Sequence, residues 1–225
     1  PGCGFSDKST VNYSVYMYAL AINDFIKNRI CRSHETSGIH AVASAASAPL
    51  LLSAAVLMPN LYSAISFINP INMENAYCNP STNPYIVKGL RAVYNTPVIG
   101  SFIYNTQYNR KAIHDALSRI PGLEVEEKEK LTDSMYEAAH TGGYYGRFLY
   151  SSIHGNLLNV DIKRMLDKLS TPLLIVSGSD NKPAKKSLST FDRENENIST
   201  IILEDINTPQ YECPKKLADI LNKSF

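Results

Sequence analysis

Short apolar runs of strand length occur near both ends of the chain, separated by stretches of helical periodicity. Such runs suit strands that are buried on both faces. Four of them predict strands: Ile39–Ala43, Ala64–Ile68, Leu173–Val176 and Thr200–Leu203. Apolar residues recur at helical spacing from about Ser14 to Arg32 and again in 213–225, which predicts one helix before the first strand and one after the last.

The middle of the chain has a different pattern. Between about Ile71 and Leu169 no strand-like run is found, and helical periodicity dominates: Tyr85–Tyr94, Tyr108–Arg119, Glu124–His140 and Asn159–Leu169. Strand, helix and strand at the spacing seen before this segment predict a right-handed parallel crossover. We therefore expect an α/β protein with one parallel sheet in sequential order. Its sheet-forming parts are 1–70 and 170–225, and 71–169 is a helical insertion.

The turn after the first predicted strand consists of very small residues, Ala43–Ala48, and an apolar helix-forming segment follows it. Strand, small-residue turn and helix is the setting of the nucleophile elbow of α/β-hydrolases, where G-x-S-x-G holds a strained serine. Small residues are needed because the backbone packs closely there. Ala43 and Ser47 align with the two glycines, and the nucleophile position falls on Ala45.

The sequence resembles an α/β-hydrolase of a bacterial type. Seven segments carry the resemblance by their order and spacing: Pro1–Ser6, Ala43–Ala48, Phe67–Pro70, Thr96–Asn105, Ala138–His140, Thr171–Gly178 and Pro209–Pro214. The resemblance implies the C-terminal part of a parallel α/β-hydrolase sheet with an inserted helical cap at 71–169. It also implies that the first strands and half of the oxyanion hole precede Pro1. We accordingly expect a fragment or processed product that self-associates through the sheet edge at 39–43.

The resemblance also assigns the catalytic positions. The order of triad residues in this family is nucleophile, acid and histidine, which places them at Ala45, Asp180 and Asn207, with Ala46 as the oxyanion residue. Alanine has no nucleophilic atom, and an asparagine side chain does not accept a proton at neutral pH. A shift of the elbow by one or two places makes Ser44 or Ser47 the nucleophile instead.

Three hypotheses follow for function. The first is a protein with reduced or no triad catalysis that binds a small apolar or ester-like ligand under its cap, where we expect His140, His154 and Tyr144 to line the pocket. The second is a working carboxylic-ester hydrolase that uses Ser44 or Ser47. The third is an inactive fragment or a protein-interaction scaffold.

Composition and charge narrow the kinds of partner, cofactor and cellular location to expect. The chain is 44% hydrophobic and 19% charged with a net charge of +1, so nothing in it favours nucleic acid as a partner. No apolar run reaches the ~18 residues of a membrane span. The four cysteines lie far apart with no metal-ligand spacing, which favours free thiols in the cytoplasm. We expect a small-molecule ligand or substrate, no cofactor and no metal.

Overall fold

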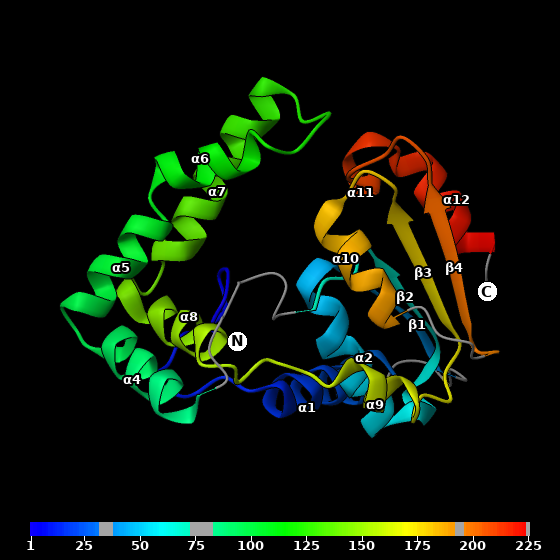
Figure 1. Ribbon diagram of the computed structural model, residues 1–225, viewed down its shortest axis with the longest axis horizontal. Helices are drawn as coiled ribbons and strands as arrows, with labels where there is room; N and C mark the ends of the chain where they lie inside the picture. The colour runs from blue at the N-terminus through cyan, green and yellow to red at the C-terminus, as the bar shows by residue number, and fades with distance from the viewer. Residues whose placement is uncertain (32–37, 73–82, 192–195, 224–225) are drawn as a thin grey trace. The chain divides into compact units, whose positions relative to one another are not determined.

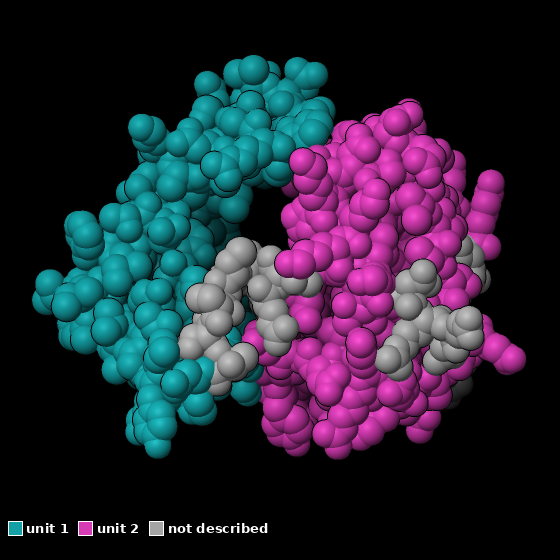
Figure 2. Space-filling model, viewed as in Figure 1, with its two compact units in different colours: residues 1–14, 77–158 teal, residues 15–76, 159–225 magenta. Residues whose placement is uncertain are grey.

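The computed structural model describes residues 1–31, 38–72, 83–191 and 196–223. They belong to two compact units (Figure 2): residues 15–76 with 159–225, here called the sheet unit, and residues 1–14 with 77–158, here called the helical unit. The observed division differs from the expected one mainly in two segments. Residues 1–14 join the helical unit and residues 159–169 join the sheet unit.

Long-range contacts explain both differences. The Lys8 ammonium donates to the carbonyl groups of Ala138 and Thr141 at 2.9 and 2.8 Å. The backbone N–H of Tyr13 donates to Ser152 Oγ at 2.9 Å. The N-terminal segment is thereby held to the helices of the insertion. Residues 159–169 contribute buried apolar side chains to the core of the sheet unit instead.

The sheet unit contains four parallel strands in the order β1-β2-β3-β4 (Figure 1). Their bounds are β1 (Ile39–Ser44), β2 (Tyr62–Ile68), β3 (Leu173–Gly178) and β4 (Ile198–Leu203). The parallel sheet in sequential order is confirmed. In the described part of the chain β1 pairs with β2 alone, and Val42 in its centre is 47% exposed.

Alternate residues of β3 point into two separate cores because side chains alternate across a strand. Leu173 and Ile175 belong to one core and Leu174 and Val176 to the other. The first core is covered by α1 (Val15–Phe25), which continues as a π-helix (Ile26–Ile30), α2 (Ala48–Leu57), α9 (Ile162–Leu166) and α10 (Lys182–Phe191). The second is covered by α12 (Pro214–Lys223). Burial on both faces explains why β3 is apolar from Leu173 to Val176.

The described residues of the helical unit form helices and loops: α4 (Pro84–Asn95), α5 (Ile99–Gln107), α6 (Arg110–Leu117), α7 (Val125–His140) and α8 (Gly146–His154). Asn83 and Asn109 cap α4 and α6 by accepting backbone N–H groups, as asparagine often does. Among the residues described, no helix is long and apolar enough to cross a membrane.

Candidate functional site

The carboxyl ends of parallel strands meet at one edge of a sheet, where open α/β sheets bind their ligands. Here the segment after each strand contains a residue that is hydrogen-bonded to the segment after another strand. These residues are Ala45 after β1, Asn69 after β2, Asn181 after β3 and Asn207 after β4. They form the candidate site, which lies entirely within the sheet unit.

Ala45 lies at the tip of the turn between β1 and α2, and its φ is +50°. A non-glycine residue in this region strains its backbone by roughly 1 kcal/mol. The Ala45 carbonyl accepts the backbone N–H of Ile71 at 3.2 Å, which ties the turn to the segment after β2. The strained residue at the tip of this turn is therefore one whose side chain ends at Cβ.

The two serines beside this position have ordinary backbone angles. Ser44 is extended, with φ −116° and ψ 146°, and Ser47 is right-handed helical, with φ −78° and ψ −18°. Ala46 follows the tip within a short 3-10 helix, Ala45–Ser47. In an elbow the N–H of the residue after the nucleophile serves the oxyanion; the residue after Ala45 is Ala46. The strained position is thus occupied by Ala45 and not by either serine.

Asn69 is the centre of the hydrogen-bond network at this edge. It is 2% exposed and has φ +45°. Its Nδ2 donates to the Asn207 carbonyl at 2.8 Å, and its Oδ1 accepts from Gly178 N–H at 2.9 Å and from Ser177 Oγ at 3.2 Å. One side chain therefore holds the ends of β2 and β3 and the turn after β4 together.

The residue after β3 whose side chain contacts Asn207 is Asn181, the neighbour in sequence of the predicted acid position, Asp180. Asn181 Nδ2 donates to Asn207 Oδ1 at 3.1 Å and to the Asn207 carbonyl at 3.0 Å. Its Oδ1 accepts the Ala184 N–H at 2.9 Å and so caps α10. The Asp180 carboxylate is exposed and accepts from Ser179 Oγ at 3.1 Å. Two neutral amides, one after β3 and one after β4, are therefore in contact at this edge.

Glu212, in the short helix α11 (Pro209–Glu212), fixes the turn that carries Asn207. Its Oε1 accepts the N–H of Asn207 at 3.0 Å, the Thr208 hydroxyl at 2.8 Å and the Thr208 N–H. Burial acts to raise the pKa of this carboxyl, but the hydrogen bonds from Thr208 and Asn207 outweigh it and lower the pKa. The ionised carboxylate thus holds Asn207 in place.

A histidine–serine pair also lies inside the sheet. His40 Nε2 and Ser66 Oγ are 2.7 Å apart, the separation of a base and a nucleophile. Ser66 is fully buried in the middle of β2, opposite Val42 of β1. Burial lowers the pKa of His40. A substrate has no access to Ser66, so this pair serves the packing of the sheet.

The predicted pocket residues His140, His154 and Tyr144 belong to the helical unit and pack among its aromatic rings. His140 is held through both ring nitrogens, by the Tyr136 carbonyl at 2.8 Å and by Asn105 Oδ1 at 3.1 Å. The ring of His154 lies 4.2 Å from that of Tyr150, and burial lowers its pKa. A cavity in this unit is lined by their sequence neighbours rather than by these three residues.

Sequence reasoning missed Asn69, Asn181 and Glu212 as parts of the site. The only local signal was their place just after a predicted strand or, for Glu212, just after the last turn. Among the described residues no group of three or more histidine, cysteine or acidic side chains could hold a metal ion.

No family model and no curated protein matches the sequence. Solved structures do match. A serine hydrolase involved in carbazole degradation, CarC, has a TM-score of 0.71 at 15% identity, over 99% of this chain and 75% of that one. An α/β-hydrolase enzyme from a Medee basin deep-sea metagenome library has a TM-score of 0.61 at 15% identity, over 98% and 74%. A variant of the meta-cleavage product hydrolase CumD has 0.64 at 15%, over 99% and 76%. Identities this low establish a shared fold rather than a shared activity.

Proposed function

We propose that this chain, which has the α/β-hydrolase fold, binds a small apolar or ester-like molecule at the carboxyl edge of its sheet without efficient triad hydrolysis. The observation that carries the proposal is the contact between the side chains of Asn181 and Asn207 at 3.1 Å. The two side chains meet at hydrogen-bond distance, as an acid and a histidine do in a triad, but neither amide takes up or releases a proton at neutral pH.

The strained turn supports the same proposal. Ala45 keeps the positive φ of an elbow tip but has no atom that attacks a carbonyl. Loss of a complete triad costs about 10⁶-fold in rate, or roughly 8 kcal/mol of barrier. Ligand binding needs none of the three groups. A bound ester would therefore be held with its carbonyl near the Ala46 N–H and released unchanged.

Stepwise restoration of the triad tests the proposal. The variants are Ala45→Ser, Asn207→His and Asn181→Asp, singly and combined, and the readout is hydrolysis of p-nitrophenyl acetate. Triad members act as a unit, so we expect each single variant to remain near the background rate and the triple variant to exceed the product of the single gains. The matched control combines Ala45→Ser and Asn207→His but keeps Asn181, so that Asp180 is the only carboxylate after β3.

Two kinds of result would count against the proposal, and a third would count against the place of the acid. Rapid hydrolysis by the unaltered chain, or labelling of Ser44 or Ser47 by a fluorophosphonate, would identify a working serine hydrolase, because only an activated serine reacts. Equal activity of the control and the triple variant would return the acid position to Asp180. Binding of phenyl acetate to the unaltered chain is measured by ligand-observed NMR. If that binding does not saturate, the proposal that the chain binds an ester-like ligand is wrong.

A further inference from the structure

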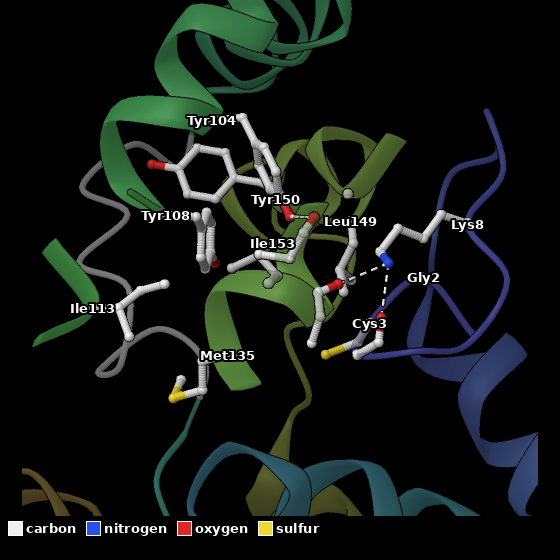
Figure 3. Close-up of a pocket in the computed structure, with 14 residues that line it drawn as sticks. Gly2, Cys3, Lys8, Tyr104, Tyr108, Ile113, Met135, Leu149, Tyr150 and Ile153 are labelled. Carbon is white, nitrogen blue, oxygen red and sulfur yellow. Dashed lines mark hydrogen bonds between the residues drawn. The ribbon is translucent and has the colours of Figure 1, made fainter. Parts of the chain in front are cut away.

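The helical unit contains a cavity of its own, of about 220 Å³ (Figure 3). Its walls come from α5, α6, α7 and α8 and from the N-terminal loop, and every lining residue belongs to this unit. Most of the lining is aliphatic or aromatic, including Tyr104, Tyr108, Leu149, Tyr150 and Ile153. The described lining of the cavity therefore shares no residue with the edge of the sheet that carries Ala45 and Asn207.

Its size suits one small ring. An apolar cavity of about 150 Å³ stays dry and binds benzene, so 220 Å³ leaves room for a ring with one or two small substituents. Gly146 lines the wall, and a Cβ at this position would meet the Tyr104 hydroxyl. The close packing at Gly146 holds Tyr104 against the wall.

The charge of the cavity favours a neutral ligand. Among the described residues that line it, Lys8 is the only lysine, arginine or acidic residue. The Lys8 ammonium donates to three carbonyl groups, those of Gly4 at 2.7 Å, Ala138 at 2.9 Å and Thr141 at 2.8 Å. An ammonium has three donors, so none remains for the carboxylate of an anionic ligand.

The side-chain phenols of Tyr104 and Tyr150 supply polar groups to the cavity wall. Burial, together with the neighbouring Cys3, raises the pKa of Tyr104 to about 12. Burial, together with Tyr94, raises that of Tyr150 to about 12 as well. Both phenols are therefore neutral at physiological pH. Tyr104 donates its proton to the Ala139 carbonyl at 2.9 Å, which leaves its oxygen as an acceptor for a ligand hydroxyl.

We propose that this cavity binds a small neutral aromatic molecule, such as a monosubstituted phenol, stacked among the tyrosines of the helical unit with the Cys3 thiol beside it. Cys3 lines the cavity and is exposed, so it lies at the rim (Figure 3). The inference is independent of the function proposed for the sheet unit, because it uses neither the turn at Ala45 nor the Asn181–Asn207 pair.

Protection of Cys3 from alkylation tests the inference in the full chain. Iodoacetamide is added with p-cresol or with p-toluate, an anion of similar size, and the rate of modification of each cysteine is followed by peptide mass spectrometry. We expect p-cresol at ten times its dissociation constant to slow Cys3 about tenfold, and p-toluate to leave it unchanged. Cys31 and Cys213 are free thiols of the sheet unit and serve as internal controls.

A cavity-filling variant localises the effect. Ile153→Phe places a ring in the proposed binding volume, and we expect it to abolish protection by p-cresol. Ile86→Phe is the matched control, since Ile86 is 53% exposed on α4 and does not line the cavity; it should be protected like the unaltered chain. Leu149→Phe fills the same volume from another position. It replaces Ile153→Phe if the circular dichroism spectrum of Ile153→Phe differs from that of the unaltered chain.

Several outcomes would overturn the inference. They are unchanged Cys3 alkylation with p-cresol, equal slowing of Cys3, Cys31 and Cys213, equal slowing by p-toluate, and full protection in both filling variants. None of them bears on the triad-restoration experiment, which reads out ester hydrolysis at the sheet edge. Failure of one proposal is therefore distinguishable from failure of the other.

Discussion

Asn69 offers the sharpest test of how the sheet edge is built. Its side chain makes three hydrogen bonds, to Asn207, Gly178 and Ser177, from a position that is 2% exposed. Its backbone adopts φ +45°, which asparagine tolerates better than most residues. Replacement by alanine removes the hydrogen bonds and adds backbone strain, whereas replacement by glycine removes the hydrogen bonds alone.

The expected loss of folding stability follows from the hydrogen bond that each partner of Asn69 loses. The Asn207 carbonyl keeps a second donor, Asn181 Nδ2 at 3.0 Å, and a hydroxyl such as that of Ser177 can rotate. Each of these two losses costs about 1 kcal/mol. The buried N–H of Gly178 loses the acceptor that Asn69 Oδ1 supplies, at about 1–2 kcal/mol. Strain at φ +45° adds roughly 1 kcal/mol for alanine. We expect Asn69→Ala to cost about 4 kcal/mol and Asn69→Gly about 3 kcal/mol.

Urea unfolding followed by circular dichroism measures the two costs, and hydrogen exchange of the β3 amides assigns them to the sheet unit. Asn28→Ala is the control, because Asn28 is exposed and its side chain bonds only Asp24 among the contacts described; it should change stability by less than about 0.5 kcal/mol. A cost of Asn69→Ala below about 1 kcal/mol would refute the network. A glycine variant less stable than the alanine variant would refute the argument from backbone strain.

Three further predictions follow. Ala45→Gly should raise stability by about 0.5–1 kcal/mol in urea unfolding because glycine adopts φ +50° freely, while Ala46→Gly should lower it; the reverse order would contradict the strained turn. Glu212→Gln should lower stability at pH 7 by about 1 kcal/mol. Because folding lowers the pKa of Glu212 below its ordinary value of 4.5, this contribution is present above pH 4.5 and is lost as the pH falls through the lower folded-state pKa, so melting temperatures of the two proteins should converge in acid. Val42→Lys should reduce self-association through β1 in size-exclusion chromatography, since a charge blocks an open edge, whereas Ile202→Lys on β4 should not; equal effects would place the contact elsewhere.

Local sequence patterns were sufficient to predict where the strands lie. Each of β1 to β4 lies within one residue or two of an apolar run. The central strands β2 and β3 are buried on both faces, and their sequences record that burial directly. The position of Ala45 was also readable, since a turn that packs backbone against backbone excludes large residues from Ala43 to Ala48. Both signals are contained in fewer than ten consecutive residues.

Contacts between distant residues decided the rest. Asp180 and Asn181 are adjacent in sequence, and only the fold shows that Asn181 faces Asn207 while Asp180 is exposed. Nothing near Asn69 indicates that its side chain bonds groups more than a hundred residues away. The N-terminal loop joined the helical unit through Lys8 for the same reason. Sequence patterns report the burial of a residue's own segment, but hydrogen-bond partners depend on which segments the complete fold brings together.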